Sequence, residues 1–264
     1  MGRKVERVSV VEYSQRGHVV TIAYNRPHTA NAIDGEMRDE LNAAWERFRD
    51  DRDAWVAILT GNGPIFCGGA DLRDGTGSTG TFAGTFWEIP TINSFESGLE
   101  LYKPTIAAVN GACIGYGLTA ALACDFLLAG DRASFAYPEV LMGMATIVGA
   151  LRLPGRVAWA DAMEMLLTGE RIDATRAKEI GLAWRVVPHE QLLDEANALA
   201  DRLCAGAPTA SRAIKEVAMR GRSLPWTDAV RFGETMRKVA AATDDAAEGR
   251  AARAEGRAPE WPGS

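Results

Sequence analysis

Residues 103–119 have the sequence KPTIAAVNGACIGYGLT, in which a short apolar segment runs directly into a glycine-rich turn. The apolar segment, residues 105–109, is typical of a strand that is buried on both faces of a sheet. Residues 55–60 (WVAILT) and 126–129 (FLLA) repeat this pattern, and residues 118–124 (LTAALAC) are a small-residue helix candidate. Short apolar strands that alternate with helices predict a layered α/β fold.

The amino-terminal part adds a strand and an amphipathic helix. Residues 18–24 are rich in β-branched and aromatic side chains, which favours a strand, and Pro27 ends it because proline cannot donate to a sheet. Asp34 is a suitable N-cap for the helix that follows. The apolar residues of this helix recur at steps of three and four and form one face: Met37, Leu41, Ala44, Trp45 and Phe48.

The chain changes character after residue 203. Residues 208–219 and 226–242 have helical patterns with no strand pattern between them. This part has too few apolar residues to form a core of its own, so we expect it to pack on the body or on a neighbouring subunit. We therefore divide the chain into a core of residues 1–205 and a helical region of residues 206–264.

Composition and charge narrow the class of protein. The net charge of −6 disfavours nonspecific binding to nucleic acid or to an anionic membrane. No apolar run approaches the roughly 20 residues of a membrane span, and the first residues lack the apolar core of a signal peptide. The four cysteines show no metal-ligand spacing, so reduced thiols in a cytoplasmic protein are the simplest interpretation. They are Cys67, Cys113, Cys124 and Cys204.

Three segments combine glycine with polar residues near the ends of expected strands, where α/β folds usually place ligands. They are residues 61–73, residues 103–119 and residues 135–153. Clustered glycines let a ligand approach the backbone and leave N–H groups free to point at it. Two such N–H groups would stabilise the enolate that forms when a proton moves near a thioester carbonyl. From spacing alone, however, ordinary tight packing is the simpler explanation of the glycines.

Four motifs make the sequence similar to the enoyl-CoA hydratase/isomerase (crotonase) superfamily over nearly the whole chain. In the family's order they are YNRP at 24–27 with NA at 31–32, FCGGADL at 66–72, AAVNG through GYG to CD within 107–125, and PE at 138–139. The resemblance implies a spiral of β–β–α turns with a C-terminal helical region for trimerisation. It also implies an acyl-CoA substrate of which coenzyme A is a part, with no separate cofactor and no metal.

The resemblance also assigns the reacting groups. The two oxyanion N–H groups fall on Ala70 and on Tyr116, where family members often have glycine. Hydratases of the family place two glutamates around one water, and the second of these matches Glu139. The first falls on Thr119, which cannot titrate in a useful range. The chain therefore resembles a hydratase that lacks one of its two carboxylates.

The family's contacts to coenzyme A fall on Arg26 and on four consecutive residues, Ala70, Asp71, Leu72 and Arg73. Arg26 and Arg73 would then reach phosphates, although a solvated surface charge explains either arginine equally well. Residues 74–84 (DGTGSTGTFAG) are rich in glycine and serine and predict either a lid or a tolerated surface insertion. For Asp125 we favour a buried structural role in hydrogen bonding over a role in catalysis.

Several functions stay open at this level. We expect an enoyl-CoA hydratase, which is a lyase, with a Δ3,Δ2-enoyl-CoA isomerase that uses Glu139 alone as the alternative. The loss of a carboxylate at Thr119 also leaves room for a non-catalytic acyl-CoA-binding protein. RNA binding has precedent in the superfamily, but the net charge does not support it. The expected assembly is a homotrimer or a dimer of trimers, with no nucleic acid and no membrane as partner.

Overall fold

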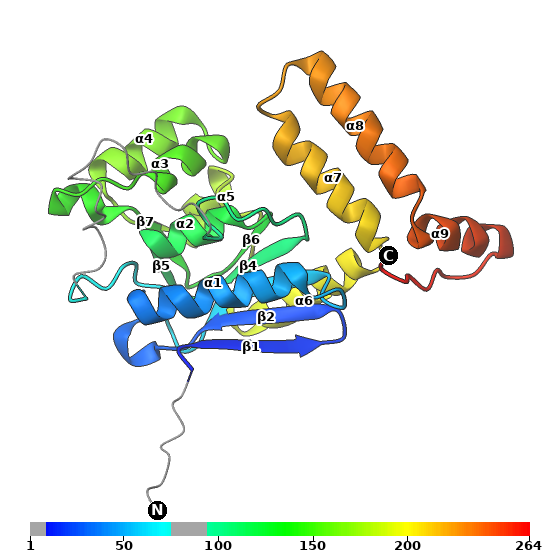
Figure 1. Ribbon diagram of the computed structural model, residues 1–264. Coiled ribbons are helices and arrows are strands. Elements are labelled where there is room, and N and C mark those ends of the chain that lie inside the picture. Colours follow the sequence, from blue (N-terminus) through cyan, green and yellow to red (C-terminus); the bar gives the residue numbers. More distant parts are fainter. Residues whose placement is uncertain (1–8, 75–93) are drawn as a thin grey trace, which may run out of the picture.

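A six-stranded sheet forms the centre of the computed structural model, which describes residues 9–74 and 94–264 (Figure 1). The strand order is β1-β2-β3-β4-β6-β9. β1 and β2 form an antiparallel hairpin, and every later pair of neighbours is parallel. The strands are β1 (Val11–Arg16), β2 (Val19–Tyr24), β3 (Val56–Gly61), β4 (Thr105–Val109), β6 (Phe126–Gly130) and β9 (Arg185–Val187).

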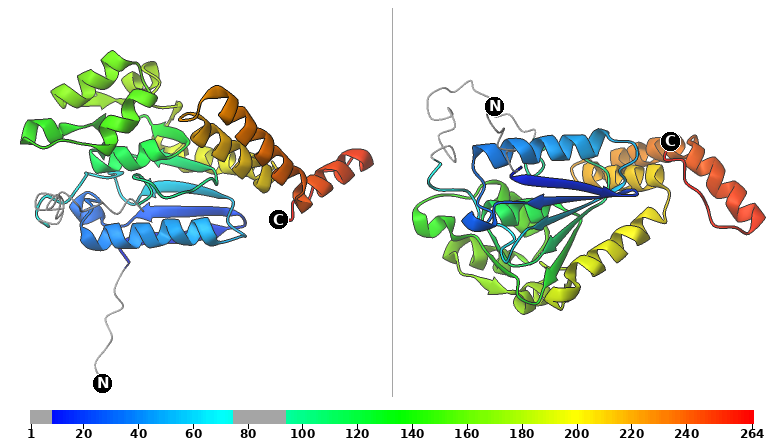
Figure 2. Two further views of the ribbon diagram at one scale, coloured as in Figure 1. Left: turned by 45° about the horizontal axis from the view of Figure 1, so that its top comes forward. Right: turned by 90° about the horizontal axis from the view of Figure 1, so that it is seen from below.

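Helices cover both faces of this sheet, and alternate strand residues supply the two cores. Helix α1 (Gly35–Asp50) packs on one face, where Leu59 belongs to the same buried cluster as Met37 and Phe48. Helix α6 (Leu192–Cys204) packs on the other face, where Ile58 belongs to a second cluster. Figure 2 shows α1 and α6 on opposite sides of the strands. The central strands are thus buried on both faces, as their apolar sequences predict.

A smaller sheet with the order β5-β7-β8 lies beside the first. Its strands are β5 (Ala112–Ile114), β7 (Ser134–Ala136) and β8 (Ile172–Asp173). Short helices join and follow these strands: α2 (Tyr116–Ala123), α3 (Val148–Arg152), α4 (Trp159–Thr168) and α5 (Ala174–Glu179). Short 3-10 helices follow several elements of both sheets: η1 (Pro27–Thr29) after β2, η3 (Pro138–Met142) after β7, η4 (Leu153–Gly155) after α3 and η5 (His189–Gln191) after β9.

The last part of the chain is helical, as its sequence predicts. Helices α7 (Pro208–Gly221) and α8 (Trp226–Ala241) form a hairpin that projects from the body, and α9 (Asp244–Glu255) follows (Figures 1 and 2). The Nζ of Lys215 on α7 donates to Lys103 O at 2.8 Å and to Asp125 Oδ2 at 2.7 Å, which ties the hairpin to the sheet. Asp125 therefore has the expected role in hydrogen bonding, but it is only half-buried, with 29% of its side chain exposed. A division into two domains at residue 205 stays a prediction.

Most expected elements are confirmed, with small shifts at their ends. Asp34 caps α1, because its Oδ1 accepts a hydrogen bond from Met37 N at 2.9 Å. The helix expected from residue 118 begins two residues earlier, at Tyr116, because Gly115 adopts a φ of 52° and ends β5 abruptly. Helix α9 was not expected. No helix among the described residues is long and apolar enough to cross a membrane.

Candidate active site

The small sheet brings three chain segments to one edge. β5 and β7 are parallel neighbours, and Gly115 N continues their pairing by donating to Ala136 O at 2.9 Å. On the other side of β5, Cys67 N donates to Ala112 O at 3.0 Å and Cys67 O accepts from Ile114 N at 2.9 Å. The three segments run in the same direction, so the residues that follow them meet at the carboxyl end of the sheet.

Ala70 and Tyr116 follow two of these segments. Gly69 has a φ of 97°, and a Cβ on it would lie 3.2 Å from Ile114 O and 4.0 Å from Tyr116 N. The two loops approach this closely because Gly69 has no side chain. Within residues 9–74 and 94–264, neither Ala70 N nor Tyr116 N donates to a protein acceptor. Tyr116 is also the first residue of α2, so its N–H adds to the positive end of a helix dipole.

Glu139 follows the third segment and faces these loops. Pro138 starts the η3 turn after β7, and the next side chain extends toward Gly115, where a Cβ would lie 2.6 Å from Glu139 Oε1. The other carboxylate oxygen, Oε2, is buried and has no hydrogen-bond partner in the described part of the chain. Burial raises the pKa of Glu139 above the ordinary glutamate range. A carboxylate in this state is suited to take up and return a proton.

Thr119 lies in the same site, but its hydroxyl is already engaged. Its Oγ1 donates to Gly115 O at 3.2 Å and shares a hydrogen bond with Tyr137 OH at 3.1 Å. Both side chains are buried. The position where hydratases carry their first glutamate thus holds a pair of hydroxyl groups and no carboxylate. Tyr137 was missed in the sequence, where its only signal is its place immediately before Pro138.

These groups line one cavity of about 640 Å³, a volume that suits a small-molecule ligand. Gly69, Ala70, Asp71 and Leu72 form part of one wall, and Tyr116, Thr119 and Glu139 also border it. Much of the remaining wall is apolar and includes Ile114, Met142, Ile147 and Val148. The cavity also has a second glutamate that no motif indicated, Glu96.

The expected coenzyme A contacts divide into two groups. Asp71 and Leu72 line the cavity beside Ala70, whereas neither arginine is among the lining residues. Arg26 has only 14% of its side chain exposed, while Arg73 has 76% exposed and is open to solvent. The geometry therefore leaves Arg73 the better placed of the two for a phosphate, and both contacts stay predictions. The expected lid over residues 74–84 falls almost entirely outside the described residues.

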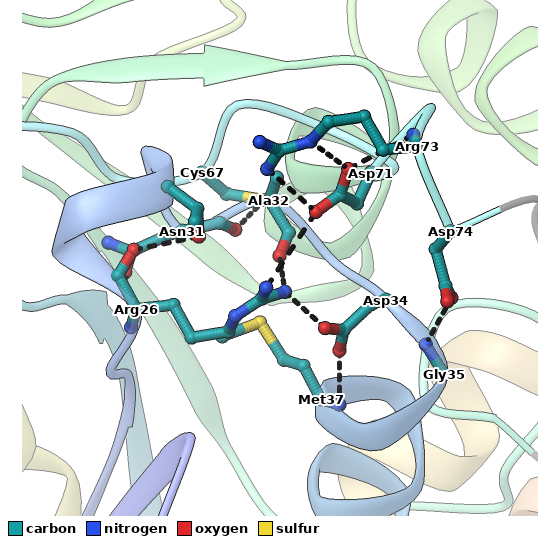
Figure 3. Close-up of polar contacts among 11 residues, drawn as sticks. Arg26, Asn31, Ala32, Asp34, Gly35, Met37, Cys67, Asp71, Arg73 and Asp74 are labelled. Atoms are coloured by element: carbon teal, nitrogen blue, oxygen red, sulfur yellow. Dashed lines mark hydrogen bonds and ion pairs between the residues drawn. The ribbon is translucent and has the colours of Figure 1, made fainter.

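Arg26 belongs instead to a network that fixes the loop around Ala70 (Figure 3). Its Nη1 pairs with Asp34 Oδ2 at 2.6 Å and donates to Ala32 O at 2.8 Å. Its Nη2 lies 3.7 Å from Asp71 Oδ2, and Asp71 Oδ1 accepts from Arg73 Nε at 3.1 Å. The network thus ties the start of α1 to the residue that follows Ala70.

Cysteine and metal chemistry find no support at this site. The backbones of Cys67 and Cys113 form an isolated parallel β-bridge beside the small sheet. The side chains of both residues are free thiols. Burial raises the pKa of Cys67 to about 12, so it stays protonated and is a poor nucleophile. Among the described residues, no group of three or more His, Cys, Asp or Glu side chains is arranged to hold a metal ion.

Comparison with known proteins identifies the family. The sequence profile described as enoyl-CoA hydratase/isomerase matches residues 14–264. The chain belongs to this family. It is 36% identical to the (E)-benzylidenesuccinyl-CoA hydratase of Thauera aromatica over 94% of this chain and 96% of the relative. It is 39% identical to the carnitinyl-CoA dehydratase of Proteus mirabilis, with the same coverage of both chains.

Solved structures of the family confirm the expected crotonase fold. The crystal structure of enoyl-CoA hydratase from Mycobacterium tuberculosis superposes with a TM-score of 0.88 at 33% identity, over 97% of this chain and all of the other. An enoyl-CoA hydratase/isomerase from Mycobacterium paratuberculosis gives a TM-score of 0.85 at the same identity. Family membership and fold, both inferred from the four motifs, are therefore correct.

Proposed function

We propose that this family member hydrates the double bond of a 2-enoyl-CoA thioester, with Glu139 as its acid and base. The observation that carries the proposal is the Glu139 carboxylate, whose buried Oε2 has no hydrogen-bond partner in the described chain. It lies beside two loops whose N–H groups at Ala70 and Tyr116 are also unengaged. An uncompensated buried charge is costly, so a protein keeps one where it has chemistry to do. The names of the relatives, a hydratase and a dehydratase, support the same reaction.

In the proposed mechanism the thioester oxygen accepts hydrogen bonds from Ala70 N–H and Tyr116 N–H. Water attacks C3 while its proton passes to the Glu139 carboxylate, and the electron pair of the double bond moves onto the thioester as an enolate. The two N–H groups and the α2 dipole stabilise this oxyanion. Glu139 then returns the proton to C2. One carboxylate thus completes the addition of water without a second acid at Thr119.

Isomerisation is the second candidate, and the engaged hydroxyl of Thr119 favours it. Here Glu139 would remove a proton from C2 of a 3-enoyl-CoA, form a dienolate held by the same N–H groups, and return the proton to C4. This reaction needs no water and no group at Thr119. A non-catalytic acyl-CoA-binding protein is the remaining alternative.

We further propose that the enzyme assembles as a homotrimer or a dimer of trimers through its C-terminal helices. Helix α8 has no buried residue, and Trp226, Val230 and Val239 on it are exposed. An exposed apolar surface of this kind favours a subunit contact. The free thiols support a reducing compartment such as the cytoplasm. No cofactor beyond the coenzyme A of the substrate enters the proposed reaction.

Incubation with crotonyl-CoA and with a 3-enoyl-CoA in deuterated water tests the reaction. We expect 3-hydroxybutyryl-CoA with deuterium at C2 from the first substrate. A shifted double bond from the second substrate, with no hydroxylated product from the first, would identify an isomerase instead. Binding of both substrates without any product would contradict both activities and favour the binding protein.

A further inference from the structure

Glu96 adds a further carboxylate to the wall of the cavity that contains Asp71 and Glu139. Its side chain is buried, with 7% of the residue exposed. Ser94 Oγ donates to Glu96 Oε1 at 2.5 Å, and Ser97 Oγ donates to the same oxygen at 3.2 Å. The Tyr116 hydroxyl lies near Glu96, and after burial the negative charge of Glu96 is the next cause that raises the pKa of this tyrosine. Two serine hydroxyl groups therefore donate to one buried carboxylate.

Neighbouring contacts hold the backbone beside this carboxylate in place. Phe95 stacks on Trp45 of α1 with ring centroids 3.8 Å apart. On the other side, Arg152 of α3 donates to Glu96 O from Nε at 2.8 Å and from Nη2 at 2.6 Å. The backbone around Glu96 is thus fixed to two helices. A recognition group held by packing and hydrogen bonds in this way is preorganised for a ligand.

The chemistry of a carboxylate limits what it can recognise. An ionised carboxylate only accepts hydrogen bonds and has about four acceptor positions, so two donors leave capacity for another. The wall near it is largely apolar, with Ile147 and Val148 among its residues. A hydrocarbon chain in this cavity would strip water from the carboxylate and return no hydrogen bond, which is unfavourable. A chain with a donor group would replace that water.

We propose that Glu96 makes the cavity selective for acyl chains that carry a hydrogen-bond donor, a hydroxyl or ammonium group, beyond the reacting carbons. The inference rests on the proposed function, in which the thioester oxygen binds to Ala70 N–H and Tyr116 N–H. Tyr116 then spans the site, because its N–H binds the thioester and its hydroxyl lies near Glu96. A tyrosine side chain is about as long as four or five carbons, so we expect the donor on about C4 to C6.

Binding of saturated acyl-CoA thioesters tests the proposal without any turnover. Two matched pairs differ only in a terminal hydroxyl: butanoyl-CoA with 4-hydroxybutanoyl-CoA, and hexanoyl-CoA with 6-hydroxyhexanoyl-CoA. Titration calorimetry gives the Kd of each. We expect the hydroxylated member of at least one pair to bind at least about 10-fold more tightly, the lower range of one hydrogen bond to a charged group. Values within twofold in both pairs would overturn the proposal.

Variants separate recognition from a merely structural role. Glu96→Leu is expected to reverse the preference, because it weakens binding of the hydroxylated ligand and strengthens that of the plain one. Glu96→Gln keeps the shape and should reduce the preference to about threefold or less. Glu100→Gln is the matched control, since Glu100 lies in the same segment, is exposed, pairs with Arg220 and does not line the cavity. It should retain the wild-type preference.

Two further outcomes would contradict the account in different ways. If Glu96→Leu weakens all four ligands by the same factor, Glu96 only positions Tyr116 and the selectivity proposal is wrong. If the wild-type protein binds none of the four ligands, the proposed function fails together with the inference. Equal binding within both pairs, by contrast, overturns the inference and leaves the proposed function standing.

Discussion

Asp71 and Glu139 are two carboxylates in the wall of one cavity, and their surroundings are opposite. Asp71 accepts hydrogen bonds from Arg73 N and Nε, both at 3.1 Å, and lies near Arg26. The hydrogen bonds from Arg73 hold the pKa of Asp71 below its usual range. Glu139 has one oxygen without any partner in the described chain, and burial raises its pKa. One carboxylate is neutralised by cations, and the other is not.

The difference shows how the site divides its tasks. Ion pairs hold the segments that carry them in fixed positions, because separating the pair would leave an uncompensated buried charge. The pairs around Asp71 hold the loop that carries Ala70, whose N–H must stay in place for the proposed enolate. An unpaired carboxylate is less stable as an anion and therefore binds protons more readily. The raised pKa of Glu139 suits it to exchange protons with a substrate, whereas the lowered pKa of Asp71 keeps that carboxylate ionised.

The largest expected effect is the loss of turnover when the carboxylate of Glu139 is replaced by an amide. Glu139→Gln should lower kcat by at least about 100-fold, because general acid–base catalysis contributes about 10²–10⁴-fold. Initial rates with the substrate identified by product analysis measure this, and circular dichroism checks that the variant is folded. A variant with a rate near that of the wild type would remove Glu139 from the mechanism.

Removing the cations that pair with Asp71 should mainly lower the stability of the fold. Arg26→Met is expected to lower the free energy of unfolding by about 3 kcal/mol, because it leaves Asp34 and Asp71 without this partner in a mostly buried setting. Arg73→Met, whose side chain is 76% exposed, should cost less than about 1 kcal/mol. Urea unfolding of both variants measures the difference, and equal losses would contradict the assignment of Arg26 as the central cation.

The raised pKa of Glu139 should appear in the pH dependence of kcat/KM. The proposed hydration starts with the ionised carboxylate, so the rate should fall as the pH decreases through the pKa of Glu139. Because burial raises that pKa, the fall should begin above the usual glutamate value of about 4.3. A profile that stays flat down to that value would contradict the assignment.

The smallest expected effect is a gain in stability at neutral pH. The folded-state pKa of Glu139 is raised, so its contribution favours folding below the unfolded pKa and is lost as the pH rises through the folded pKa. Glu139→Gln should therefore unfold at a slightly higher urea concentration than the wild type at pH 7. The gain should shrink toward pH 4. A Gln variant that is less stable at pH 7 would show that the carboxylate has a stabilising partner.

The sequence predicted the elements whose signals are local. The face of α1 was correct because its apolar residues repeat over a single helix, and β4 was correct because it is apolar on both faces. The three-residue strands β5 and β7 were not predicted, because so few residues carry no periodicity. Their positions come from tertiary pairing, which also brings Gly115 next to Glu139.

The polar partners of the site were harder to predict than its motifs. Thr119 was identified as a departure from the family, but the hydrogen bond from Tyr137 depends on contact between residues 18 positions apart. Glu96 has no neighbouring motif, and the residue beside it, Phe95, stacks on Trp45, which is far away in the sequence. Arg26 was expected to contact a phosphate, yet its closest partner is Asp34. Such pairings depend on the three-dimensional fold.

Exchange at C2 of a saturated thioester tests the central claim most directly, because butyryl-CoA can be neither hydrated nor isomerised. In deuterated water the wild-type enzyme should introduce deuterium at C2 faster than the enzyme-free control, by way of the enolate held at Ala70 and Tyr116. Glu139→Gln should bind butyryl-CoA with a Kd within about threefold of the wild type and lose the exchange. Exchange by the Gln variant at the wild-type rate would show that another group moves the proton and would contradict the account.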